Sequence, residues 1–117
     1  MTSKEKKELD KLFSLAVRER DHYTCQKCGT INKHVQTAHI FSRSNLSVRW
    51  ELLNGITLCY YCHINWCHRK PVEWTEWVKN YLGQDKWDTL VVYRNLKRRI
   101  NYKEKKAELG SLIKSEN

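Results

Sequence analysis

The sequence predicts a small α+β protein, with helices arranged around one short β-hairpin. The chain has 117 residues, which is the size of one domain and too short for a doubly wound nucleotide-binding fold or a TIM barrel. Two short runs, at 35–40 and 55–58, contain β-branched residues and predict strands. Apolar residues spaced three and four apart on either side predict helices. We expect a single domain over 1–117.

The first helix is predicted over residues 3–20. Ser3 is its expected N-cap, because a serine hydroxyl can accept a hydrogen bond from the first turn. One apolar stripe along this segment contains Leu9, Leu12, Phe13 and Ala16. After the helix, the segment 21–32 predicts a turn. The polar segment 41–54 predicts a loop between the two strands.

Helices are also expected after the second strand. The first would run from about Tyr60 to Cys67 or His68. The next would hold Pro71 in its first turn, because the missing N–H costs nothing there, and would stop near Gly83.

A last long helix would begin at Asp85 as N-cap. Its apolar side would contain Trp87, Leu90, Val91 and Ile100. From Tyr102 onward we expect it to fray into a tail rich in Lys and Glu.

The net charge is +9, from 22 Lys and Arg against 13 Asp and Glu, and it indicates a polyanionic partner such as nucleic acid. The excess lies in the segments 18–70 (+5) and 84–117 (+4). The densest cluster of basic residues has two interpretations, a nucleic-acid contact or a solvated helix face. It contains Arg94, Lys97, Arg98, Arg99, Lys103, Lys105 and Lys106.

The N-terminal segment is polar and has no apolar stretch typical of a signal peptide, and no stretch is long enough to span a membrane. We therefore expect a cytoplasmic protein without a membrane partner. Thiols stay reduced in the cytoplasm, so the five cysteines are expected to be metal ligands or buried thiols, not disulfides.

Four of the five cysteines form two CxxC pairs, Cys25–Cys28 and Cys59–Cys62, with 30 residues between the pairs. One CxxC turn brings two thiolates to the same ion, and two such turns complete a tetrahedral sulfur site that selects zinc. A redox role is disfavoured because no βαβ pattern surrounds either pair. Cys67 has no matching partner and is expected to be buried or partly exposed.

The order His39, Asn54, Cys59-x2-Cys62 and His63 resembles the HNH endonuclease family, which has the ββα-metal fold. The resemblance covers about 17–71, and we expect that segment to form the zinc-stapled core, with 72–117 as a helical C-terminal extension. The run from His39 to Arg43, with Arg49-Trp50 and Asn54, further resembles phage recombination nucleases of the NinG-like branch. A phage protein would act in the host cytoplasm.

The resemblance implies a role for each of three residues. His39 would be the general base, for which an imidazole with a pKa of about 6.5 is suited. His63 would bind a catalytic divalent ion such as magnesium, manganese or nickel. Asn54 would tie the loop across the hairpin and orient His39. The zinc would clamp helix to hairpin, so that the two histidines face each other across a groove.

One position departs from the family pattern. Many members carry a metal-binding Asp or His just before the general base, and this chain has Ala38 there. A further ligand could be His68, although it lies five residues after His63 and a regular α-helix brings i+4 to the same face. Gln36 and His34 are weaker candidates. His34 and His22 are expected to be surface residues.

Arg43, Arg49 and Arg69 flank the expected groove and are candidates to clamp phosphate. The alternative is a role in solubility or a pair with Glu51. Three further candidates for nucleic-acid binding come from the C-terminal cluster: Arg94, Lys97 and Arg98. Trp74 and Trp77 are expected to be mostly core, with base stacking as the lesser reading.

Together these features predict a metal-dependent endonuclease acting on double-stranded or branched DNA. The alternative is a non-catalytic zinc module that binds DNA or protein, which Ala38 supports. The C-terminal helices are expected to contact DNA, a phage protein partner or a second copy of the chain.

Overall fold

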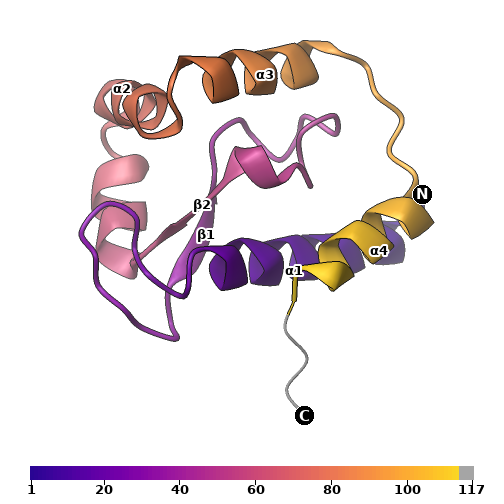
Figure 1. The fold of residues 1–117 in the computed structure, drawn as a ribbon, viewed down its shortest axis with the longest axis horizontal. Helices are drawn as coiled ribbons and strands as arrows, with labels where there is room; N and C mark the ends of the chain where they lie inside the picture. The colour runs from indigo at the N-terminus through magenta and orange to yellow at the C-terminus, as the bar shows by residue number, and fades with distance from the viewer. Residues whose placement is uncertain (114–117) are drawn as a thin grey trace.

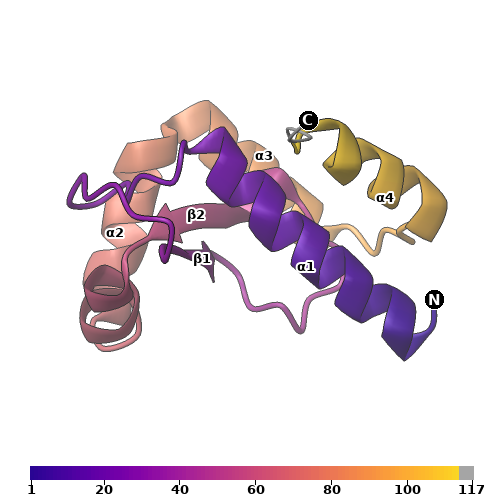
Figure 2. The same cartoon turned by 90° about the horizontal axis from the view of Figure 1, so that it is seen from below.

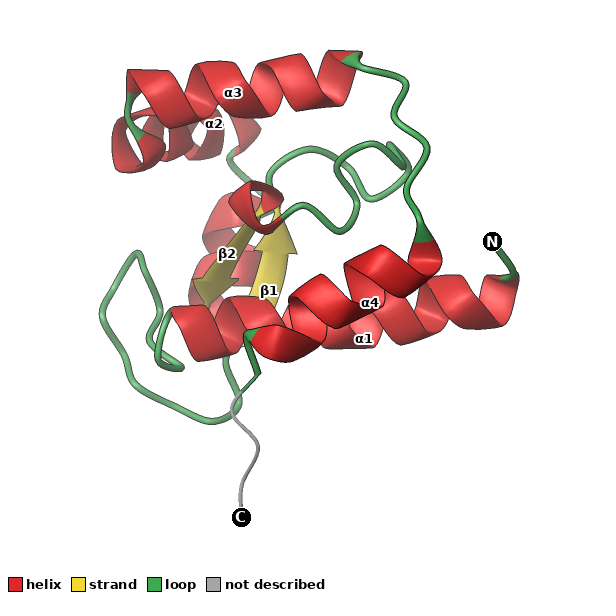
Figure 3. Cartoon of the chain, turned by 45° about the vertical axis from the view of Figure 1, so that its right-hand side comes forward, coloured by secondary structure: helices red, strands yellow, loops and turns green. Residues whose placement is uncertain are grey.

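Two antiparallel strands lie near the centre of the structure, and helices cover them (Figure 1). The computed structural model describes residues 1–113. Strand β1 spans Gln36–His39 and pairs with β2, Gly55–Leu58, so that His39 lies opposite Gly55. The predicted hairpin is confirmed, with β1 shorter than expected. The protein is a small, compact α+β molecule (Figure 3).

Helix α1 spans Ser3–Arg20, as predicted, and lies against the hairpin (Figure 2). Its N-cap is Thr2, so the expectation of Ser3 was wrong. The Thr2 hydroxyl accepts from the Glu5 backbone, and the Glu5 carboxylate accepts from the Thr2 backbone. This reciprocal arrangement satisfies two N–H groups that would otherwise have no partner.

The helix predicted from about Tyr60 to Cys67 or His68 is present, but most of it is not α-helical. Tyr60 and Tyr61 are helical, and the chain continues as the π-helix η2, Cys62–Cys67, in which the His68 N–H donates to the His63 carbonyl at 3.1 Å. Helix α2 then spans Pro71–Leu82, with Pro71 in its first turn as predicted. Gly83, at φ 81°, ends it in a conformation that favours glycine.

The predicted last helix is two helices. Helix α3 spans Gln84–Asn95, with Gly83 and not Asp85 at its N-cap. Residues 96–101 are extended and lead to α4, Tyr102–Ser111. The prediction of a fraying tail from Tyr102 onward was therefore wrong.

Helix α4 forms because several local interactions support it. The Asn101 side chain caps it by accepting from the Glu104 N–H at 3.0 Å. Leu109 is fully buried in the cluster against α1. Glu8 of α1 accepts from the Tyr102 hydroxyl at 2.6 Å and pairs with Lys106 at 2.8 Å.

The hydrophobic core has two parts. The first contains residues from the first cysteine turn, the hairpin, η2 and α2: Cys25, Ala38, Ile56, Leu58, Cys62, Cys67, Trp74 and Val78. The second lies mainly between α1, α4 and the loop before β2: Leu9, Phe13, Ala16, Val17, Trp50 and Leu109. All four residues of β2 are buried, as expected for a strand covered on both faces. Trp74 belongs to the first of these two parts and is a core residue, as predicted.

The loop between the strands carries one 3₁₀ turn, η1, at Leu52–Asn54. Within residues 1–113, no helix combines the length and the apolar character needed to cross a membrane.

Candidate metal centre and the histidine-bearing hairpin

The four cysteines of the two CxxC pairs come together in space. The Sγ atoms of Cys25, Cys28, Cys59 and Cys62 all lie within 4.8 Å of one another. Tetrahedral zinc with Zn–S bonds of about 2.3 Å requires sulfurs about 3.8 Å apart. The Cys28 and Cys59 sulfurs lie 3.7 Å apart. This cluster could hold a metal ion such as zinc, as the cysteine spacing predicts.

Two similar turns present the sulfurs. In each, the backbone N–H of the second cysteine donates to the sulfur of the first at 3.5 Å, from Cys28 to Cys25 and from Cys62 to Cys59. Such bonds offset the charge of a metal-bound thiolate. Gly29 follows at φ 80°, where a side chain would be strained.

The first turn is fixed to the hairpin, because the Gln26 N–H donates to the carbonyl of Thr57 in β2 at 3.0 Å. The second turn follows β2 directly. A metal at the four sulfurs would therefore join the segment after α1 to the start of η2, on which His63 lies.

The thiols of this cluster differ in acidity. Hydrogen bonds with Thr30 lower the pKa of Cys28 to about 6. Burial raises the pKa of Cys59 and that of Cys62. Crowded thiols cannot all ionise without a cation, and a bound metal would displace their protons.

Cys67 does not belong to the cluster. Its side chain is buried in the first hydrophobic core, and burial raises the pKa of its thiol to about 11. It behaves as a small apolar residue, in line with the expectation from its lack of a CxxC partner.

His39 is the last residue of β1 and lies partly buried beside α1. Its ring stacks on Phe13 at 5.0 Å between centroids. Its Nε2 lies 3.2 Å from the Arg49 carbonyl, which can only accept, so the proton is on Nε2 and the lone pair on Nδ1. Burial lowers the pKa of His39 below 6.5, which keeps the imidazole neutral at neutral pH.

Asn54 is fully buried and ties together the loop between the strands. Its Oδ1 accepts from the Phe41 N–H at 2.8 Å. Its Nδ2 donates to the carbonyls of Phe41 and Val48, both at 3.0 Å. These three bonds hold the chain on either side of the loop in place just beyond His39.

His63 lies on the π-helix, and His68, which directly follows the last residue of that helix, lies beside it. Their ring centroids are 4.6 Å apart. The wider turn of η2 is what brings positions five apart to the same face. Gln36 of β1 contacts His63 Nδ1 at 2.7 Å, through its Oε1, so Nδ1 carries the proton and Nε2 has a free lone pair. Burial and the neighbouring charges of His68 and His39 lower the pKa of His63.

The two faces of β1 separate these histidines. His39 stacks on α1, and Thr37 of the same face bonds to Ser14 of α1. Gln36, on the other face, contacts His63, and Ala38 is buried with the core around η2. His39 and His63 affect each other electrostatically but share no contact, so the structure does not show them facing each other directly.

Two of the predicted phosphate clamps meet a carboxylate instead. Arg49 pairs with Asp10 of α1 through two bonds of 2.9 and 2.7 Å, and Arg43 reaches the same carboxylate at 3.3 Å. The Trp50 indole also donates to Asp10, at 2.8 Å. The Arg43 side chain is 63% exposed and remains accessible, whereas that of Arg49 is 13% exposed.

The sequence does not indicate that Asp10 binds these residues, because Asp10 lies in a polar part of the predicted helix that resembles a solvent-exposed face. Among the ion pairs of residues 1–113, none joins Glu51 to Arg43, Arg49 or Arg69, which was the alternative role for these arginines. Glu51 instead lies 3.5 Å from Arg98, which also donates to the Ser47 carbonyl.

The remaining basic candidates lie on the surface. Arg69 is exposed just after η2, and Arg94 lies over the Phe41 ring at 4.8 Å. Lys97 is exposed in the extended segment after α3. They do not form one cluster around the hairpin.

Comparisons of the chain with family models, with curated proteins and with solved structures find no match.

Proposed function

We propose that the protein is a metal-dependent DNA endonuclease of the HNH type. One observation carries the proposal: the first strand of the hairpin ends in His39, and a helical turn that pairs His63 with His68 follows the last cysteine of the four-cysteine cluster directly. A loop stitched by the buried Asn54 completes the arrangement. His39, Asn54, Cys59-x2-Cys62 and His63 follow one another in the order that resembles the HNH family.

His39 has the features of a general base. Its neutral imidazole has a free Nδ1 lone pair, and the Arg49 carbonyl holds its tautomer through Nε2. In the proposed reaction, His39 Nδ1 takes a proton from the water that attacks the phosphodiester. Arg49 therefore acts through its backbone, while its guanidinium is engaged with Asp10.

His63 and His68 are the residues that would hold a divalent cation. Imidazole nitrogens suit transition metals, and a metal-binding imidazole usually donates its other N–H to an oriented acceptor. The contact of His63 Nδ1 with Gln36 meets that description. The bound cation would supply stabilisation of the charge that develops on the leaving oxygen.

DNA is the proposed substrate because the net charge is +9. Cationic surfaces attract nucleic acid by displacing its counterions, so binding would weaken steeply with added salt. Double-stranded or branched DNA remains the proposed form, and the cytoplasm the proposed location.

A second candidate is a zinc-containing module that binds DNA or protein without catalysis. Two observations favour it. Ala38 offers no metal ligand beside His39. The His39 side chain lies on one face of β1, and His63 lies against the opposite face. Both candidates share the cysteine cluster and the charge. Only a cleavage assay separates them.

The test is nicking of supercoiled plasmid by the zinc-loaded protein with Mg²⁺, Mn²⁺ or Ni²⁺. We expect cleavage that is lost in His39→Ala and retained in the matched control His22→Ala, an exposed histidine. Absence of cleavage with all three metals would refute the nuclease proposal and favour the binding module. Cleavage that persists in His39→Ala would refute His39 as the base.

A further inference from the structure

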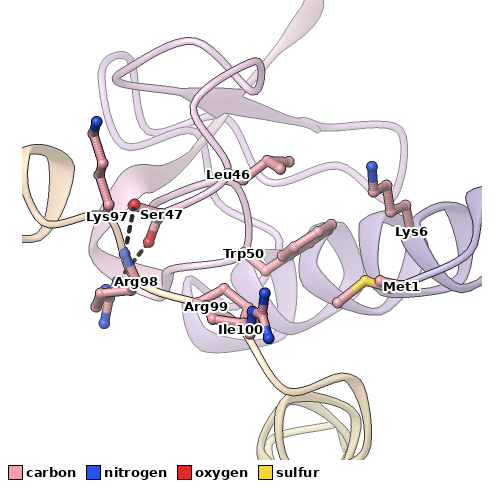
Figure 4. A pocket seen from close by; sticks show the side chains of 9 residues that line it. All are labelled: Met1, Lys6, Leu46, Ser47, Trp50, Lys97, Arg98, Arg99 and Ile100. Carbon is pink, nitrogen blue, oxygen red and sulfur yellow. Dashed lines mark hydrogen bonds between the residues drawn. The ribbon is translucent and has the colours of Figure 1, made fainter.

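A cavity of about 590 Å³ lies away from the cysteine cluster, between the start of α1, the loop before η1 and the extended segment 96–101 (Figure 4). We call this segment the strap. A volume of this size is typical of small-molecule sites. The strap forms one wall of the cavity, Lys6 of α1 the opposite side, and Trp50 lies between them in Figure 4.

The strap is fixed in place by Ser47. The Ser47 hydroxyl bonds to the Leu96 carbonyl, and the Arg98 N–H donates to the same hydroxyl at 3.3 Å. The Arg98 guanidinium binds the Ser47 carbonyl and Glu51. The bonds of Arg98 therefore stabilise the strap as one wall of the cavity. They hold this wall in place without a ligand.

The other cationic side chains that line the cavity are available to a ligand. Within residues 1–113, the side chains of Lys6, Lys97 and Arg99 form no ion pair or hydrogen bond, although all three line the cavity. No Asp or Glu is among the described residues that line it. Like charges gathered in a hollow without counter-ions favour an anionic ligand.

The same cavity has an apolar side. Leu46 is 45% exposed at its rim, and Ile100 packs beside Trp50 in the second core. Trp50 is only 2% exposed and forms the floor. A backbone phosphate of duplex DNA needs cations only, and a hollow with an apolar wall would add nothing to its binding. The combination instead fits a ligand with a phosphate and an apolar ring.

We propose that this cavity binds a nucleoside monophosphate unit, either as a free nucleotide or as the unpaired end of a DNA strand. Lys6 and Arg99 contact the phosphate, and the base lies against Leu46. The DNA-end source rests on the proposed function, whereas binding of a free nucleotide does not depend on it.

The test measures binding of dAMP, deoxyadenosine and inorganic phosphate by calorimetry, without added divalent cation. We expect dAMP to bind more tightly than either part alone. Arg99→Ala should weaken dAMP binding by about tenfold, the effect of one charged hydrogen bond. Lys33→Ala, which removes an exposed lysine elsewhere, should leave it unchanged. Leu46→Asp should also weaken dAMP binding. Arg99→Ala and Leu46→Asp should both keep the circular dichroism spectrum of the wild type.

A second arm distinguishes the source of the nucleotide. Fluorescence anisotropy compares a blunt duplex with the same duplex carrying a short single-stranded overhang. Tighter binding of the overhang, lost in Arg99→Ala, supports the DNA end, whereas dAMP binding without this preference supports a free nucleotide. The proposal is overturned if phosphate binds as tightly as dAMP, or if Arg99→Ala and Lys33→Ala behave alike. A failed plasmid assay would refute the nuclease and leave the dAMP result standing.

Discussion

Asp10 and Arg49 are 39 positions apart in the chain and form a two-pronged ion pair, with Nε–Oδ1 at 2.9 Å and Nη2–Oδ2 at 2.7 Å. The pair attaches the loop between the strands to α1. Because the Arg49 carbonyl contacts His39, the same attachment fixes the position of the proposed base. Asp10 is thus a positioning residue: it bonds to Arg49 and not to His39, although its charge also acts on the His39 imidazole.

Replacing Asp10 with Asn should destabilise the protein by about 2 kcal/mol, because charged hydrogen bonds to Arg49 and Trp50 are weakened in a partly buried site. Chemical denaturation measures the change. Asp88→Asn is the control and should change stability little, because Asp88 is exposed and its carboxylate accepts from the Gln84 side chain in a bond that asparagine can keep. Equal effects of the two substitutions would contradict the role of Asp10.

The effect of Asp10 should depend on pH. Burial raises its pKa, but hydrogen bonds from Arg49 and Trp50 outweigh burial, and the net pKa is below 3.8. A lowered folded-state pKa gives stability that is present above 3.8 and is lost as pH falls through the folded value. The stability difference between wild type and Asp10→Asn should therefore shrink in acid. A difference that stays constant down to the folded-state pKa would contradict the ion pair.

Asn54→Ala should destabilise the protein by about 3 kcal/mol or more. It removes the Asn54 partner of the Phe41 N–H and of the Phe41 carbonyl, at about 1–3 kcal/mol for each group, and one of the two donors to the Val48 carbonyl, which keeps the Glu51 N–H. Thermal unfolding measures the loss. Asn80→Ala on the exposed side of α2 is the matched control and should unfold near the wild-type temperature. A mild effect at Asn54 would mean that water replaces its bonds.

Gly55→Ala should destabilise the protein by about 1–3 kcal/mol through overpacking. A Cβ at this position would meet Val17 Cγ2 at 2.6 Å and Phe13 Cζ at 2.8 Å, and both side chains are buried. Gly110→Ala is the control, because its Cβ would have open space in α4 and alanine favours helix. The double variant Gly55→Ala with Val17→Ala should recover part of the loss, and no recovery would argue against the clash.

Cys59→Ser should abolish stoichiometric zinc and lower the unfolding temperature sharply, because metal-binding energy contributes to folding. Elemental analysis and thermal unfolding are the measurements. Cys67→Ala tests a cysteine outside the cluster and should keep one zinc per chain. Retained zinc and unchanged unfolding in Cys59→Ser would rule out the four-sulfur site.

The pH dependence of the proposed DNA cleavage tests His39. A base must be neutral, so the rate should fall as pH drops through the pKa of His39, which burial places below 6.5. We expect the acidic limb of the rate profile to have its midpoint below 6.5. A midpoint well above 6.5 would assign that limb to another group.

Local patterns predicted much of this structure. The apolar stripe of α1, the glycine at the start of β2 and the proline of α2 placed those elements correctly, and the CxxC spacing predicted the cysteine cluster. These signals lie within a few residues of the feature they determine.

Other features depend on contacts far along the chain. Helix α4 buries only Leu109, so it lacks an apolar stripe, and its support comes from α1. Trp50 donates to Asp10, which lies 40 positions away in the chain, and no local pattern predicts such a pair. The π-helix is six residues long, too short to show a period of its own.

The π-helix η2 has a consequence for both of its sides. Because its turn takes one residue more than an α-helical turn, residues five apart lie on the same face. Cys62 and Cys67 therefore both reach the first core, while His63 and His68 stay together beside it. With one residue fewer, an α-helical turn could still bring two imidazoles together at i and i+4, but the two buried cysteines would be spaced four apart as well. One extra residue thus sets the spacing of a buried thiol pair and of an imidazole pair at once.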